Sequence, residues 1–258
     1  MKGDKNLSQL TLTALPDIPL IEPGDDLVEI LLQSLGKAQI ELQDGDVLVV
    51  AQKIISKAEG RRINLAEVVP SPEAQALSEE TRKDPRLLEM ILQESQSVVR
   101  KRPGLVITEH NLGFISANAG IDHSNVAGSE DWVLLLPKDP DASADRLRAG
   151  LEQASGAQLG VLIIDSHGRA WRVGTVGITI GLSGLPGVVD LRGEKDLVGY
   201  ELVATIVGAA DELAAGASLL MGQVAEATPV VHVRGFPYAL RDARLPELLR
   251  QPETDLFR

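Results

Sequence analysis

The chain has 258 residues, of which 44% are hydrophobic and only 3% aromatic, so any core has to be mainly aliphatic. Its formal net charge of −12 argues against a nucleic-acid partner, because binding to a phosphate backbone depends on Lys and Arg. Cys is absent, which excludes disulfides, thiolate zinc sites and Cys nucleophiles. No secretory signal is visible, and Asp211 and Glu212 interrupt the longest apolar stretch, so we expect a cytoplasmic protein without a membrane span.

The first third of the chain predicts a strand followed by helices. The apolar run VLVVA, Val47–Ala51, is typical of a buried strand, and Gly60 marks the end of the helix or turn that follows. Two more helices are predicted to begin at Ser71-Pro72 and Asp84-Pro85, because Ser and Asp suit the cap and Pro the first helical position. A stripe of Leu and Ile predicts that the second of these helices continues to the cations at 100–102.

The rest of the chain alternates between predicted strands and helices. Apolar runs predict strands at residues 105–109, 132–137, 159–165 and 229–236. One helix is predicted from a cap at residue 141 or 143 to Gly156, and the longest helix candidate is 200–220. The Gly-rich stretch 173–187 indicates a sheet with sharp bends. We therefore predict an α/β fold with mixed α and β structure, a single region over 1–258 with two interleaved lobes.

Several common nucleotide and metal motifs are absent from the sequence. It contains no G-x-x-x-x-G-K-[ST] loop, no G-x-G-x-x-G fingerprint and no H-E-x-x-H pair. The four histidines show no close metal-ligand spacing. A nucleotide or metal site in this chain therefore has to be built in another way.

Two acidic residues lie in settings suited to a hard metal ion. Asp165 ends an apolar strand and opens a turn, at the carboxyl end where α/β sheets bind ligands. Asp122 lies in the polar stretch ANAGIDHSN, residues 117–125, between two predicted strands. Asp, Asn and Ser oxygens are ligands that Mg²⁺ or Mn²⁺ prefers. An Asp at such a position is also an ordinary turn former, so spacing alone leaves both interpretations open.

Basic residues near the predicted strand ends are candidates for holding an anion. Lys53 and Lys57 are four residues apart and share one face if their segment is helical. They follow a buried strand, a position suited to phosphate binding. Arg169 and Arg172 flank Trp171 and are suited to an anionic substrate. Solvated lysines and surface ion pairs are the alternative interpretation of both sets.

Several segments, in the same order, resemble one protein family. They are GDVLVVAQKIISKAEGR, RPGLVITEHNLGFISANAGIDHSN, IIDSHGRAWRVGTVGITIG, and GLPGVVDLRGEKDLVGYE with the later LLMGQ. These segments are similar to the coenzyme F420-0:L-glutamate ligases, also called gamma-glutamyl ligases, and the resemblance extends from about Pro19 to Phe236. It implies a single catalytic region in the stand-alone form, without a C-terminal nitroreductase-like domain. It also implies an intertwined homodimer with a fold particular to this family.

The resemblance implies a GTP-dependent ligase. GTP would phosphorylate the lactyl-phosphate carboxylate of a deazaflavin precursor, coenzyme F420-0, to an acyl phosphate. The amine of L-glutamate would then attack to give an amide, GDP and phosphate, and later glutamates would be joined through the γ-carboxylate. The family is similar in using two Mg²⁺ or Mn²⁺ ions and a K⁺ ion. Divalent cations offset the repulsion among anionic groups that meet in one site.

The resemblance also assigns site residues, position by position. Asp122 and Asp165 match ligands of the first metal. Ser166 and Gln223 match the second metal, with Ser where some relatives have Thr and Gln where some have an acid. Asn125 matches a GTP contact. The other implied GTP contacts, of which Lys57 would bind a phosphate, are Ile18, Pro19, Leu20, Ile21, Gln52, Lys53 and Lys57.

Two alternatives stay open at the level of the sequence. The first is a GTP-binding protein on the same fold that has lost catalysis. The second is another metal-dependent amide ligase, or a phosphohydrolase, that acts on a different acid. Asp122, Asp165 and Lys57 favour the ligase over the first alternative, because a protein that only binds GTP needs no pair of metals.

Overall fold

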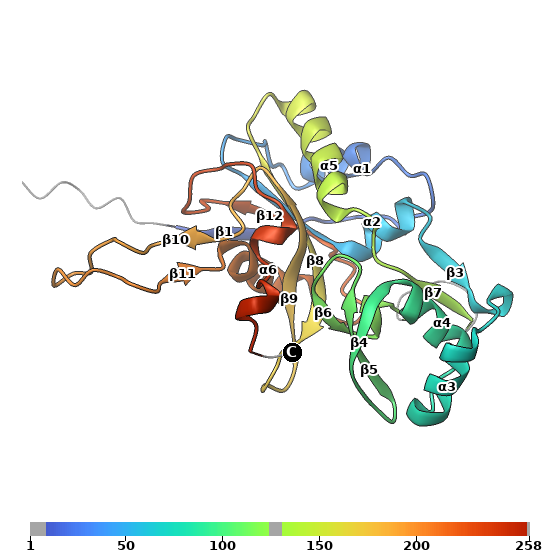
Figure 1. Cartoon of the computed structure of the whole chain (residues 1–258). Coiled ribbons are helices and arrows are strands. Elements are labelled where there is room, and N and C mark those ends of the chain that lie inside the picture. Colours follow the sequence, from blue (N-terminus) through green and yellow to red (C-terminus); the bar gives the residue numbers. More distant parts are fainter. Residues whose placement is uncertain (1–8, 124–130, 257–258) are drawn as a thin grey trace, which may run out of the picture.

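A five-stranded sheet forms the centre of the structure, a computed structural model that describes residues 9–123 and 131–256 (Figure 1). In spatial order its strands are β1 (Thr11–Ala14), β12 (Val230–Arg234), β2 (Val47–Ala51), β8 (Gly160–Gly168) and β9 (Thr175–Ser183). β2 and β8 are parallel, and the other neighbours are antiparallel. Val47, Val49 and Val50 are fully buried, as expected of a parallel strand that is covered on both faces.

Four helices pack around this sheet. They are α1 (Leu27–Lys37), α2 (Gln52–Ala58), α5 (Pro140–Ser155) and α6 (Ala209–Met221). Both α5 and α6 pack on β9, α1 packs on α5, and α2 follows β2 directly. In the described part of the chain, no helix has the length and apolar character that crossing a membrane requires.

The Gly-rich stretch forms β9, and its glycines allow two helices to approach closely. A Cβ atom on Gly177 would lie 2.7 Å from the carbonyl oxygen of Ala214 in α6, and one on Gly181 would lie 2.6 Å from Pro140 of α5. An extra residue bulges β9 opposite Ile163 and the next residue of β8. The predicted sheet is confirmed, but close helix packing rather than sharp bending explains these two glycines.

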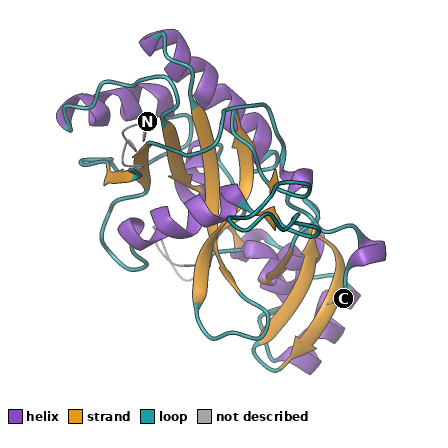
Figure 2. Ribbon diagram, turned by 90° about the vertical axis from the view of Figure 1, so that its left-hand side faces the viewer, coloured by secondary structure: helices purple, strands orange, loops and turns teal. Residues whose placement is uncertain are grey.

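A second hydrophobic cluster is built from one contiguous part of the chain, between Leu65 and Leu135. Its elements are β3 (Arg62–Asn64), η1 (Leu65–Glu67), α3 (Pro72–Thr81), α4 (Pro85–Gln93), β4 (Ser95–Arg102), β5 (Leu105–His110), β6 (Ile115–Ala117), η2 (Asn118–Gly120) and β7 (Trp132–Leu134). β3 pairs with β7, and β4, β5 and β6 form a separate sheet. We call residues 61–135 the inserted lobe, because the chain enters it after α2 and returns with α5. Figure 2 shows helices against the central sheet and against the strands of the inserted lobe.

A two-stranded arm projects from the central sheet (Figure 1). It consists of residues 189–207 and contains the antiparallel strands β10 (Val189–Asp190) and β11 (Ile206–Val207). Several large apolar side chains of the arm are exposed, namely Leu197, Val198, Tyr200, Val203 and Ile206. Apolar patches of this kind commonly mark interfaces.

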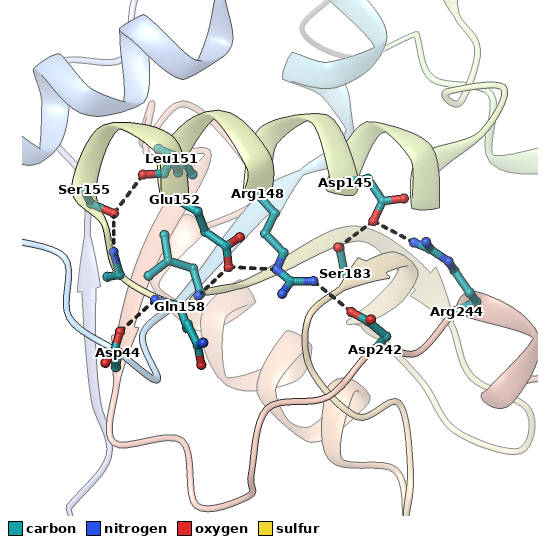
Figure 3. A network of polar contacts seen from close by, with 12 residues as sticks. Asp44, Asp145, Arg148, Leu151, Glu152, Ser155, Gln158, Ser183, Asp242 and Arg244 are labelled. Atoms are coloured by element: carbon teal, nitrogen blue, oxygen red, sulfur yellow. Dashed lines mark hydrogen bonds and ion pairs between the residues drawn. The ribbon is translucent and has the colours of Figure 1, made fainter.

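Ion pairs fasten the C-terminal segment to α5 (Figure 3). This segment, residues 240–256, contains η3 (Leu245–Glu247) and η4 (Pro252–Thr254). Arg148 Nη1 lies 2.9 Å from Asp242 Oδ1, and Arg244 Nη1 lies 2.8 Å from Asp145 Oδ1. The buried side chain of Leu245 adds an apolar contact to the core of the central sheet. Together these contacts hold residues 242–245 against α5, and η3 packs on β9.

Several predicted elements are confirmed at the residue level. β2 covers the predicted run, and strands occur at 105–110 and 230–234. Ser71 Oγ accepts the amide of Ala74 at 3.2 Å, and Asp84 Oδ1 accepts the amide of Arg86 at 2.8 Å, so both helix caps are as predicted. Gly156, with a φ of +77°, ends α5.

α4 is shorter than predicted. It ends at Gln93, and the residues up to the cations at 100–102 form β4, which pairs with β5 across a turn at Pro103-Gly104. Pairing with β5 and the two valines of β4 favour the extended backbone over the helical stripe. The cations therefore lie on an exposed strand rather than at a helix end.

Three other boundaries also differ from the prediction. α6 begins after Gly208, and the first part of the helix predicted at 200–220 belongs to the arm, which makes α5 the longer helix. α5 itself begins earlier than predicted, because Asp139 caps it and Pro140 occupies the first position. The strand predicted at 132–137 ends at Leu134. In each case a tertiary contact or a local cap, rather than the apolar period, sets the boundary.

Candidate functional site

A cavity of about 450 Å³ opens at the edge of the central sheet where β2 and β8 end. Because these strands are parallel, their carboxyl ends meet at one edge, where ligands bind in α/β sheets. We call this cavity the strand-end pocket. Its lining includes α2, the loop after α6, and Ile18 and Leu20 from the segment after β1.

Most of the predicted site residues line the strand-end pocket. They are Ile18, Leu20, Gln52, Lys53, Lys57, Asp165, Ser166 and Gln223. The other two residues of the IPLI run, Pro19 and Ile21, are not among the lining residues, and Ile21 is buried in the core at 4% exposure. Asn125 lies outside the residues that the structure describes.

Asp122 does not line the pocket itself, but it contacts Gln52 and Lys53, two lining residues in the first turn of α2. Its Oδ2 atom accepts a hydrogen bond of 2.9 Å from Gln52 Nε2 and lies 3.5 Å from Lys53 Nζ. Burial raises the pKa of Asp122 to about 6, although Lys53 acts to lower it and the nearby Asp165 carboxylate acts to raise it. The two acidic residues are thus close enough to repel each other, and a bound cation would relieve that repulsion.

A strained turn places Asp122 at this position. Asn118, Ala119 and Gly120 have φ values of +52°, +53° and +66°, a left-handed turn that is costly for the first two residues. A Cβ atom on Gly120 would lie 2.7 Å from Leu136 Cδ1, so only glycine fits there. After the turn, the backbone of Asp122 exchanges hydrogen bonds of 3.0 and 2.9 Å with Leu134 of β7. The carboxylate is therefore held by backbone on one side and by α2 on the other.

Asp165 and Ser166 lie inside β8, which continues to Gly168, so the predicted turn at Asp165 is wrong. The prediction failed because the β8–β9 hairpin extends beyond the end of β2, whose pairing with β8 stops at Ile164. Asp165 is nevertheless the first residue past the parallel pair, which is the position that the ligand argument required. Ser166 Oγ donates a hydrogen bond of 3.0 Å to Gln223 Oε1 across the pocket.

The predicted pair of lysines shares one face of α2, and both residues line the pocket. Burial lowers the pKa of Lys57, and the neighbouring Lys53 cation lowers it further. Among the described residues, Lys57 has no carboxylate within ion-pair distance. A polyanion bound beside the two lysines would offset both the burial and the mutual repulsion.

The pocket offers oxygen donors to a metal ion, but few charged ones. Among the described residues, no group of three or more His, Cys, Asp or Glu side chains is placed to hold a metal. The lining supplies the carboxylate of Asp165, the hydroxyl of Ser166 and the amide oxygen of Gln223, and the Asp122 carboxylate lies nearby, in contact with the first turn of α2. This all-oxygen set fits Mg²⁺ or Mn²⁺, which keeps several bound waters or substrate oxygens in addition to protein ligands.

The loop after α6 contributes more to the pocket than the sequence predicted. Besides Gln223, the lining includes Val224, Glu226 and Thr228 from this loop, and α6 itself adds Ser218. Backbone amides hold the pKa of Glu226 below its usual range, the amide of Val224 foremost, and that amide donates to Glu226 Oε2 at 2.8 Å. Gly222, with a φ of +69° at the end of α6, was the available sequence signal for a sharp turn into this loop.

Comparison with known proteins places this architecture in a family. The model of the family described as F420-0:Gamma-glutamyl ligase matches residues 17–235. The chain belongs to this family. That range contains every residue that lines the strand-end pocket as well as Asp122. The C-terminal segment with η3 and η4 lies beyond this range.

Curated relatives of this ligase family are similar over almost their whole length. A coenzyme F420:L-glutamate ligase of Methanothermobacter thermautotrophicus is 44% identical over 96% of this chain and 99% of its own. One of Methanopyrus kandleri is 44% identical over 98% of this chain and 99% of its own. One of Archaeoglobus fulgidus is 41% identical over 93% of each chain. The resemblance stated from the sequence segments is thereby confirmed.

Proposed function

We propose that the protein is a GTP-dependent ligase that adds L-glutamate to the lactyl-phosphate carboxylate of coenzyme F420-0. The family and the names of its relatives support the acceptor and the amino acid. The observation that supports the nucleotide is the strand-end pocket, which two lysines line together with a carboxylate, a hydroxyl and an amide. Such a pocket combines phosphate-binding cations with ligands for the metal that accompanies a nucleoside triphosphate.

The proposed reaction has two steps. An oxygen of the acceptor carboxylate attacks the γ-phosphorus of GTP, and GDP leaves. The amine of L-glutamate then attacks the carbonyl carbon of the acyl phosphate, and inorganic phosphate leaves with that oxygen as the amide forms and the amine loses a proton. The same steps on the γ-carboxylate of the product would add further glutamates.

The residues of this chain have separate tasks in that reaction. Lys57, with Lys53 beside it, binds the phosphates of GTP. Asp122 and Asp165 hold one divalent cation, Ser166 and Gln223 a second, and a K⁺ ion completes the expected set. When bound, the divalent cations neutralise charge on the phosphate oxygens and make the phosphorus more electrophilic.

A second proposal concerns assembly. The arm presents exposed apolar side chains that this chain leaves uncovered, with Leu197 fully exposed and Val198 at 89%. A second copy of the chain fits this surface, because a pair of arms exchanged between two copies would bury them symmetrically. We therefore propose a homodimer held by the arms.

One incubation tests the proposed activity. The protein is mixed with coenzyme F420-0, GTP, L-glutamate and Mn²⁺, and the products are analysed by mass spectrometry. We expect a glutamyl adduct together with GDP and phosphate, and no adduct with ATP in place of GTP or with a chelator present. GTP binding without any adduct would favour an inactive nucleotide-binding protein. An adduct on another acid only would favour a ligase with a different acceptor.

A further inference from the structure

His167 touches a proposed metal ligand but has no task in the reaction described above. It lies on β8 two residues after Asp165, so both side chains point to the same face of the strand. His167 Nε2 lies 2.9 Å from Asp165 Oδ2, and the side chains are only 6% and 11% exposed. An ionised carboxylate can only accept hydrogen bonds, so Nε2 has to be the donor.

The contact between the two side chains is close but not yet aligned as a hydrogen bond. Nε2 of His167 is one of the buried polar atoms without a hydrogen-bond partner in the described structure. A buried donor without a partner is costly, so the side chain needs a reason to be there. The Asp165 carboxylate is the acceptor within reach of this donor, and hydrogen bonds at such sites often tighten only in the ligand-bound state.

Packing from the inserted lobe holds the imidazole ring in place. The ring of Phe114 lies 5.2 Å from that of His167 at an interplanar angle of 58°. His110 stacks on Phe114 at 5.0 Å and 9°. The Nδ1 atom of His110 accepts a hydrogen bond of 3.0 Å from the backbone amide of Leu112, which fixes the orientation of the His110 ring as well. The column of three rings therefore connects the β5–β6 hairpin to Asp165 on the central sheet.

We propose that His167 is a positioning residue that orients the Asp165 carboxylate for a divalent cation. The inference rests on the metal site of the proposed function. Residues behind a metal ligand fix its orientation, and their loss typically weakens metal binding by about 10- to 100-fold. Of the two buried histidines in the ring column, only His167 contacts a proposed ligand, so His110 provides a matched control.

The test measures binding of Mn²⁺ alone, by electron paramagnetic resonance, without GTP or acceptor. His167→Phe keeps a ring against Phe114 but removes the donor, and we expect about 10- to 100-fold weaker Mn²⁺ binding with the melting temperature near that of the wild type. His167→Gln keeps an N–H at a similar reach and should restore most of the affinity. His110→Phe should bind Mn²⁺ like the wild type.

The outcomes separate this inference from the proposed function. Equal Mn²⁺ affinity in the wild type and His167→Phe, or equal losses in His167→Phe and His110→Phe, would overturn the positioning role alone. A wild type that binds no Mn²⁺ would overturn the metal site and the inference together. If His167→Phe unfolds, the comparison of His167→Leu with His167→Gln decides the same question.

Discussion

At the residue scale, the site depends on charges that the fold brings together from distant parts of the chain. The Asp165 carboxylate acts to raise the pKa of Asp122, although 43 positions separate the two residues in the sequence. Lys53 Nζ lies 3.5 Å from Asp122 Oδ2, and Lys57 lines the pocket with no carboxylate within ion-pair distance among the described residues, although the charge of Glu22 acts on it.

Asp165→Asn should abolish turnover and leave the fold intact. The change keeps the shape of the side chain but removes the charge that a divalent cation requires, so we expect kcat to fall by more than about 100-fold. Steady-state GDP release measures the rate, and circular dichroism checks the fold. Asp190→Asn, on the exposed arm, is the matched control and should keep its activity. Turnover near the wild-type value in Asp165→Asn would show that Asp165 is no metal ligand.

Lys57→Ala should weaken GTP binding. Hydrogen bonds to charged groups contribute about 1.5–3 kcal/mol, so we expect the Kd for GTP to rise by at least about tenfold. Isothermal titration calorimetry measures the Kd. Lys83→Ala is a suitable control, because burial also lowers the pKa of Lys83 but that residue lies in the inserted lobe, away from the pocket. An unchanged Kd in Lys57→Ala would remove this lysine from the phosphate site.

At the element scale, β2 is anchored by a buried carboxylate at its start. Asp46 is 1% exposed and accepts hydrogen bonds from Arg234 Nε at 2.9 Å and Arg234 Nη2 at 2.7 Å, while His232 Nε2 lies 2.8 Å away. His232 and Arg234 belong to β12, so the cluster ties β12 to the start of β2. Burial acts to raise the pKa of Asp46, but the hydrogen bonds outweigh it and hold the pKa below its usual range.

Asp46→Asn should destabilise the protein and reduce its sensitivity to acid. Removing one partner of a buried ion pair costs about 3 kcal/mol of unfolding free energy. Because the folded pKa lies below the unfolded value of about 3.9, the stabilisation by Asp46 is present above that pH and is lost as the pH falls through the folded value. Urea denaturation at several pH values measures both effects. Asp242→Asn, on an exposed residue, should change little, and a wild-type acid profile in Asp46→Asn would contradict the role of the cluster.

Sequence patterns predicted the elements that are determined by interactions between residues close together in the sequence. The run at β2 and the caps Ser71 and Asp84 were found because burial and capping act on neighbouring residues. β4 and the second part of the arm, residues 200–207, were predicted as helix, because their strand pairing comes from residues elsewhere in the chain. The strand-end pocket was predicted through resemblance and strand-end chemistry, whereas Glu226 and Thr228 were missed because a loop lining has no period.

At the scale of the whole molecule, the site combines residues from the two hydrophobic clusters, and the arm is separate from it. The carboxylate of Asp165 comes from the central sheet, and that of Asp122 follows the inserted lobe's left-handed turn. Their distance therefore depends on how the inserted lobe packs on the sheet. The arm lies apart from both clusters and leaves its apolar side chains for the proposed partner copy (Figure 1).

Val198→Asp on the arm should shift the protein from dimer to monomer. A charge at an apolar interface is costly to bury without a partner, so the dimer should dissociate at micromolar concentration. Sedimentation velocity distinguishes the two states. Val69→Asp is the matched control, because Val69 is exposed to a similar degree, 86% against 89%, but lies on the inserted lobe. A monomeric wild type, or a variant that remains a dimer, would contradict the proposed assembly.

The central claim is that GTP activates the acceptor carboxylate in the strand-end pocket before glutamate attacks. The most direct measurement uses coenzyme F420-0 whose lactyl carboxylate carries a heavy isotope of oxygen, with GTP, L-glutamate and Mn²⁺. Mass spectrometry of the released phosphate should find one heavy oxygen for each glutamyl amide formed, because the carboxylate oxygen leaves with the phosphate. Unlabelled phosphate beside a glutamyl product, or no glutamyl product at all, would contradict the account.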